Sequence, residues 1–403
     1  MKPLLAVLLA VTAGAQDFSQ RGYLESGTYY YPQEAPGDSG RVTSNLLLRY
    51  EAAYKASSNL RFNASIDARA DTHREVEREA HLSWWDREAQ RPALEIRRLG
   101  LIYTRGEFTL ELGKQLIRWG KADLLNPTDR FAPRDYINLV QTEYLPVTAA
   151  HLTWAHAADS VEFVYTPRFT PSRTPLLNQR WAPVPPGIQV VDGGARFPGG
   201  PQFGLRWNHA GSRIEYSLSA FDGFNHLPVL DLTVRSLAPP SVQVARQYAR
   251  IRSYGGEAAM PMKWVTVKGE AAYFTSPDRF ADEYAQYVVQ LEKQSGEWFF
   301  TGGYAGETVT KRRSVLTYAP DRGMTEAFLG RAGYTIDSNR NVALDAAVRR
   351  NGDGSWLKLE YSQAFGQHWR GTGGFAWIRG TPQDFLGQYH LNSHLFLLLR
   401  YSF

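Results

Sequence analysis

Charged side chains of both signs gather in one stretch, residues 117–148, which reads IRWGKADLLNPTDRFAPRDYINLVQTEYLPVT. Fixed charges act on ions by attraction and repulsion, and rings of such side chains select solutes in pores. If this segment borders a water-filled passage, it would filter solutes by charge. The candidate residues for such a constriction are Arg118, Lys121, Asp123, Asp129, Arg130, Arg134 and Asp135.

Other residue patterns suggest catalysis only superficially. The string Gly37-Asp38-Ser39-Gly40 matches a serine-protease motif, but a nucleophilic serine also needs a placed histidine and an oxyanion hole. The pairs His151/His156 and His390/His394 lack the context of a metal site. No phosphate-binding loop or dinucleotide fingerprint follows a strand into a helix. We therefore predict no enzyme, no cofactor and no metal site.

The first residues, MKPLLAVLLAVTAGAQDF, have the form of a secretory signal peptide. Lys2 supplies the positive charge, an apolar stretch follows, and small residues precede Gln16. We predict a signal peptide over residues 1–15 and a single domain over residues 16–403. The chain has no cysteine, so an exported form would hold together without disulfides.

Charge and hydropathy exclude some classes of protein and leave others open. The net charge of +5 comes from interspersed acidic and basic residues, which argues against nucleic acid as a partner. After the leader no run of about 18 apolar residues occurs, so no spanning helix is expected. The mean hydropathy of −0.39 does not exclude a membrane barrel, because lipid-facing and water-facing residues alternate along its strands.

Apolar and polar residues alternate with a period of two from one end of the chain to the other. For example, Leu46, Leu48 and Tyr50 share one face of an extended segment, with Arg49 and Glu51 on the other. We count about 18 such segments, joined alternately by short turns and long links. Closed barrels of the outer membrane have this organisation. The pattern predicts an all-β transmembrane antiparallel barrel and disfavours a β-propeller or a soluble sandwich.

Two stretches are less regular. Residues 21–31 alternate poorly but are counted as the first strand. Residues 246–260 change phase near Tyr254, which predicts a β-bulge there.

The last strand is amphipathic and reaches the end of the sequence. Leu395, Leu397 and Leu399 alternate toward Tyr401 and Phe403 on one face. This strand resembles the C-terminal signal of bacterial outer-membrane barrels. The resemblance implies that the assembly machinery recognises Tyr401 and Phe403 and that the strand pairs with the first strand. We also expect aromatic residues at both membrane interfaces, with Tyr389 at one end of this strand and Tyr401 or Phe403 at the other.

The charged segment follows the fifth predicted strand and is the third long link. In porins the third external loop folds into the barrel and narrows it. Residues 113–120 (GKQLIRWG) with Asn126-Pro127 are similar to a pattern in porin-like outer-membrane proteins related to alginate-export channels. This resemblance implies a channel but no particular solute. The alternative for residues 117–148 is a segment that caps the rim or packs outside.

The leading hypothesis is a porin-like channel of the bacterial outer membrane for small hydrophilic or charged solutes. The expected partners are outer-membrane lipid, the barrel-assembly machinery and small solutes, and a homo-oligomer is possible. The alternative function is a barrel scaffold or conduit that binds a periplasmic or extracellular partner protein. A barrel enzyme acting on lipids is a third, disfavoured hypothesis.

Overall fold

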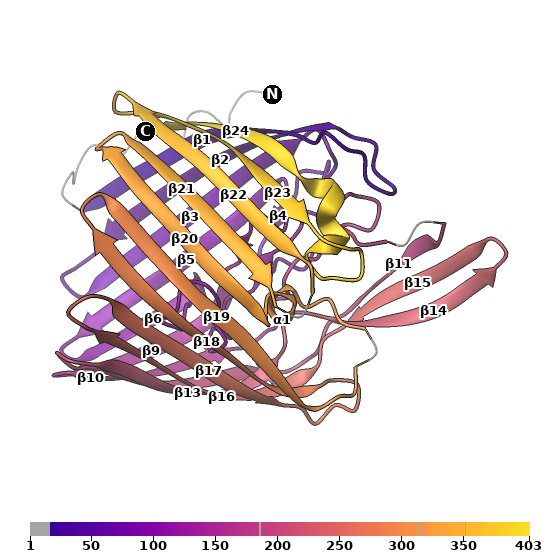
Figure 1. Cartoon of the computed structure of the whole chain (residues 1–403). Helices are drawn as coiled ribbons and strands as arrows, with labels where there is room; N and C mark the ends of the chain where they lie inside the picture. Colours follow the sequence, from indigo (N-terminus) through magenta and orange to yellow (C-terminus); the bar gives the residue numbers. More distant parts are fainter. Residues whose placement is uncertain (1–16, 185–186, 315, 351) are drawn as a thin grey trace.

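The protein folds as one closed sheet of antiparallel strands (Figure 1). The computed structural model describes residues 17–184, 187–314, 316–350 and 352–403. The predicted signal peptide lies outside the described residues. Within them, no helix is both long and apolar enough to cross a bilayer.

Eighteen strands form the barrel, each paired with its neighbours in chain order. They are β1 (Phe18–Tyr30), β2 (Val42–Lys55), β3 (Leu60–Asp71), β5 (Leu94–Arg105), β6 (Phe108–Gln115), β9 (Val147–His156), β10 (Asp159–Thr166), β12 (Gln202–Ala210), β13 (Glu215–Phe224), β16 (Arg250–Pro261), β17 (Thr266–Thr275), β18 (Glu283–Ser295), β19 (Trp298–Lys311), β20 (Ala327–Asp337), β21 (Arg340–Arg349), β22 (Ser355–Phe365), β23 (Trp369–Arg379) and β24 (His394–Ser402). β24 pairs with β1, from Tyr23↔Ser402 to Tyr30↔Leu395, and closes the cylinder. The predicted fold and strand number are confirmed. Closure satisfies the backbone groups that an open edge would leave unpaired.

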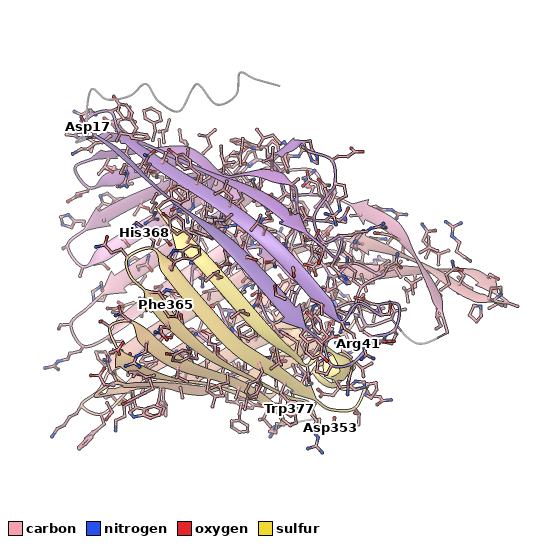
Figure 2. The ribbon with its side chains drawn as sticks, turned by 90° about the horizontal axis from the view of Figure 1, so that it is seen from above. Asp17, Arg41, Asp353, Phe365, His368 and Trp377 are labelled. Atoms are coloured by element: carbon pink, nitrogen blue, oxygen red, sulfur yellow. The ribbon has the colours of Figure 1, made fainter. Side chains whose placement is uncertain are left out.

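The two ends of the barrel differ. One end carries the short turns, such as 366–368, together with both ends of the strand series. The other carries the long links. In Figure 2, Phe365 and His368 lie at the short-turn end, whereas Arg41 and Asp353 lie at the long-link end. Short and long connections alternate as predicted.

The outer face of the strands is apolar and the inner face is polar. On β24 the side chains of Leu395 and Leu397 are 54% and 62% exposed on the outside, whereas His394 and Phe396 are buried inside. Tyr389 was expected at a membrane interface, and this expectation is wrong. The 3₁₀ helix η1 (Gly387–Asn392) carries the Tyr389 side chain into the barrel mouth, where it is buried.

The predicted bulge near Tyr254 is also wrong. The pairs of β16 with β13 and β17 run without a register shift. The apparent change of phase arises because Ile251 faces inward and belongs to an apolar cluster inside the barrel. A register shift occurs instead on the pair of β3 with β5, between Ser65 and Ile66. It places Arg97 as an extra inward-facing side chain, buried inside the barrel.

The long links contain short elements of their own. These are β4 (Leu82–Ser83), β7 (Arg134–Asp135), β8 (Glu143–Tyr144), β11 (Gln189–Arg196), β14 (Val229–Leu237), β15 (Pro240–Gln247) and α1 (Pro320–Gly323). Strands β11, β15 and β14 form a separate sheet, which projects beyond the long-link end in Figure 1. We call it the projecting sheet.

The seam between β1 and β24 gives a first prediction. Phe403 and Gly22 exchange two backbone hydrogen bonds of 2.9 Å, and the Phe403 ring lies so close to Gly22 that an added Cβ would be 2.7 Å from it. Phe403→Ala should lower the temperature at which the refolded barrel loses its heat-modifiable gel mobility. The control is Phe365→Ala, because Phe365 is exposed to the same degree but lies within the β22–β23 hairpin. Equal shifts for the two variants would refute a special role of the seam.

Candidate pore constriction

The link between β6 and β9, residues 116–146, runs through the inside of the barrel, and we call it the crossing segment. The Thr128 hydroxyl oxygen lies 3.1 Å from the Glu257 carboxylate on β16. Farther along the chain, Gln141 accepts a hydrogen bond from the Tyr29 hydroxyl on β1. Because β1 and β16 are far apart around the closed sheet, the segment reaches across the interior. It does not pack on the outside of the barrel.

One wall residue, Glu270 on β17, holds the first turn of the crossing segment. Its carboxylate accepts backbone hydrogen bonds from Lys121 (3.2 Å), Ala122 (3.3 Å) and Thr128 (2.8 Å). The Thr128 hydroxyl adds a fourth bond of 2.8 Å. Gly120 makes this approach possible: its φ is +102°, and an added Cβ would lie 2.9 Å from the Glu270 carboxylate.

Aromatic side chains fix the same turn to β12 and β13, which lie on the same side of the barrel as β17. The ring centroid of Trp119 lies 5.2 Å from that of Phe131, and Phe131 lies 5.1 Å from Phe221 on β13, both edge to face. Gly204 on β12 gives the rings room, since an added Cβ would be 2.4 Å from Phe131. The segment is therefore anchored by packing as well as by hydrogen bonds.

Two candidate arginines lie on one tyrosine ring. The guanidinium carbons of Arg118 and Arg134 lie 3.8 Å and 4.4 Å from the centroid of Tyr144. Arg118 is also paired with Asp129 at 3.1 Å, yet 47% of its side chain is exposed. Cation–π contacts of this kind hold a guanidinium in place without neutralising it. Asp129 is buried, and burial raises the pKa of its carboxyl group.

A second group of arginines surrounds Glu143, the residue before Tyr144. Glu143 lies 2.9 Å from Arg69, 3.5 Å from Arg97 and 3.6 Å from Arg49. Burial alone would raise the pKa of Glu143, but these three arginines hold it well below the ordinary value. The contacts fix the returning part of the crossing segment to β2, β3 and β5.

Within these two groups the arginines outnumber the carboxylates that they contact. The five arginines of the two groups contact three carboxylates. The arginines are Arg49, Arg69, Arg97, Arg118 and Arg134, and the carboxylates are Asp67, Asp129 and Glu143.

The other candidate residues are dispersed. Lys121 pairs with Glu215 at 3.0 Å and Asp123 pairs with Lys268 at 2.8 Å, both on the wall near the short-turn end. Asp135 is buried in a different network, 2.9 Å from Arg91 and 3.3 Å from Arg173 of two other long links. Arg130 faces a cavity on the long-link side.

Sequence reasoning found the crossing segment but missed several residues that organise it. Tyr144 was not singled out, although an aromatic residue beside Glu143 in an arginine-rich barrel could have suggested a cation–π platform. Arg97 was hidden by the register shift on β5. No local signal in the sequence identifies the wall residue that accepts the hydrogen bonds of the turn at Thr128.

Comparisons with known proteins give structural matches only. No family model and no curated protein sequence matches the chain. A mutant Rhodopseudomonas blastica porin is 10% identical, with 96% of this chain and 100% of that chain covered and a TM-score of 0.44. Pseudomonas aeruginosa OpdK, solved with vanillate, is 9% identical, with coverages of 96% and 98% and a TM-score of 0.54. The OpdK likeness concerns the fold alone. With the closure of β1 on β24, it makes this chain a porin-like β-barrel of 18 antiparallel strands.

Proposed function

We propose that the protein is a bacterial outer-membrane channel for small hydrophilic or charged solutes, with residues 117–148 as its constriction. One observation carries the proposal: Arg118, inside the barrel and on the segment that crosses it, keeps half of its side chain exposed to water. A plug sealed against the wall would bury this group. Passage would be diffusive, through water, past charged side chains that favour one sign of solute.

The positive excess around Tyr144 leads us to propose a preference for anions. Of the two arginines on the ring, only Arg118 forms an ion pair among the described residues, with Asp129. At the short-turn side of the same passage, Lys121 and Lys268 are paired with acidic residues, so they contribute less net charge.

Liposome swelling and reversal potentials test this function. Purified protein in liposomes should admit small sugars and small organic anions. In a planar bilayer under a salt gradient, the reversal potential should have the sign of an anion-selective pore. Liposomes that stay impermeable to every small solute would contradict the channel, and a cation-selective reversal potential would contradict the assigned charge.

The membrane placement and the partners belong to the same proposal. Large apolar side chains such as Leu397 and Leu205, 62% and 51% exposed on the barrel exterior, would contact lipid. The short-turn end would face the periplasm and the long links the outside. Tyr401 and Phe403, at the end of the closing strand, would be read by the barrel-assembly machinery. Association of several copies would not alter the passage within each barrel.

The projecting sheet favours a second candidate function, the binding of an extracellular partner protein. Its side chains Val234 and Leu237 are 62% and 85% exposed, beyond the end of the barrel. A scaffold of this kind would co-purify with its partner in stoichiometric amounts from native membranes, and Val234→Asp would abolish this. Recovery of the barrel alone, together with solute uptake by the liposomes, would leave the channel as the function.

A further inference from the structure

A cavity of about 280 Å³ lies between the crossing segment and the links of the long-link end. We call it the vestibule cavity. Arg130 lines it from the crossing segment, Trp181 and His226 from two other links, and Tyr389 from η1. Its volume is near the lower end of the range for small-molecule sites.

Buried polar atoms around the vestibule cavity lack partners. Four lining side chains each have a buried nitrogen or oxygen with no hydrogen-bond partner among the described residues: Arg130 Nε, His226 Nε2, Trp356 Nε1 and the Tyr389 hydroxyl. Arg130 itself is only 6% exposed. A buried polar group without a partner costs free energy. Arg130 Nε and Trp356 Nε1 can only donate, so each of these two groups lacks an acceptor.

Arg130 is the arginine of the cavity that has no acidic partner of its own. Two arginines and two aspartates line the cavity, Arg130, Arg134, Asp129 and Asp321, but Asp129 is paired with Arg118, which lies outside the lining. Arg130 has no ion pair among the described residues, and its guanidinium carbon lies 5.0 Å from the Phe274 ring centroid. Burial, and then the two arginines, lower the pKa of His226 to about 3, so the imidazole is neutral.

The remaining wall is apolar. Leu125 and Val140 come from the crossing segment, Leu227 from the link after β13, Ile378 from β23 and Phe385 from the last link. A ligand that leaves water for this cavity would gain by burying hydrocarbon against these side chains. A fully hydrated inorganic anion would not.

We propose that the vestibule cavity binds a small monocarboxylate with an apolar body, such as an aromatic acid. The carboxylate would accept hydrogen bonds from Arg130 and from the unpartnered donors, and the body would lie on the apolar wall. The proposal deepens the channel function and rests on it, because the bound acid is a solute held on its way through the barrel.

Calorimetric titration of the detergent-solubilised barrel tests the site. Benzoate is the probe, benzamide is a neutral molecule of the same shape, and acetate is an acid without the apolar body. We expect saturable binding of benzoate, with benzamide and acetate each weaker by about tenfold or more. Arg130→Met should weaken benzoate about tenfold and leave benzamide unchanged. The control is Arg331→Met, on β20 and outside the cavity.

Two results with the unaltered protein would refute the site. One is the absence of saturable benzoate binding, as expected of a cavity filled by water alone. The other is equal affinity for benzoate and benzamide. Benzoate affinity unchanged in a folded Arg130→Met barrel would also overturn it. Binding in detergent does not require conduction. If the barrel conducts but does not bind benzoate, the binding site is refuted and the channel function stands. If it binds benzoate but never conducts, the channel function is refuted.

Discussion

Glu270→Ala should release the crossing segment from the wall and give the largest change in conductance of any single substitution. The variant loses all four hydrogen bonds that the carboxylate accepts from Lys121, Ala122 and Thr128. Each of these hydrogen bonds contributes about 0.5–1.5 kcal/mol, and the backbone donors would be left without partners. We expect a larger mean conductance with frequent transitions between levels, measured on single channels.

The matched control for this variant is Glu360→Ala. Glu360 is also an inward carboxylate, on β22, and it pairs with Lys358 at 2.7 Å. It has no hydrogen bond to the crossing segment among those found in the described residues. Steady, unchanged conductance of the Glu270→Ala channel would show that the turn at 120–128 does not limit the passage.

Removing the two arginines on Tyr144 should abolish the anion preference. The double variant Arg118→Gln and Arg134→Gln deletes two positive charges and keeps side chains of polar character. A unit charge at about 4 Å in water is worth about 1 kcal/mol, or about fivefold in an ion's partition. We therefore expect the anion-to-cation permeability ratio, from reversal potentials, to fall by roughly an order of magnitude in dilute salt, and less at high ionic strength.

A second double variant separates this effect from the general charge of the lumen. Arg331 on β20 and Arg370 on β23 are inward arginines away from the crossing segment. Arg331→Gln with Arg370→Gln removes the same charge. If both double variants shift the reversal potential equally, selectivity is a property of the whole lumen and the constriction near Tyr144 has no special part.

The barrel could be predicted because the alternation of apolar and polar residues depends only on residues that are close in sequence. Apolar and polar residues alternate with period two along each strand. The strand's own sequence therefore shows that Arg49 and Leu48 lie on opposite faces, whichever strands are its neighbours. Failures occurred where distant contacts override this rule. Ile251 faces inward because the crossing segment covers it, and the apparent bulge at Tyr254 is a result of that burial. Tyr389 lies in the mouth because η1 replaces the start of the expected strand.

The candidate site could be predicted only as a segment. The position of residues 117–148 in the chain and their charges suggested a constriction. The roles of individual residues depend on contacts between positions far apart in sequence, such as Thr128 with Glu270. For the same reason Asp135, which resembles the other charged candidates in sequence, lies in a separate buried network with Arg91.

The central claim, that the crossing segment borders the path of the solute, can be tested with one thiol. The chain has no cysteine, so Arg118→Cys gives a single reactive group. A water-soluble thiol reagent added during single-channel recording should lower the conductance in one irreversible step, with anionic and cationic reagents shifting the selectivity in opposite directions. Leu397→Cys, on the outer face of β24, should give no such step. Complete labelling of Cys at position 118 with an unchanged current would contradict the account.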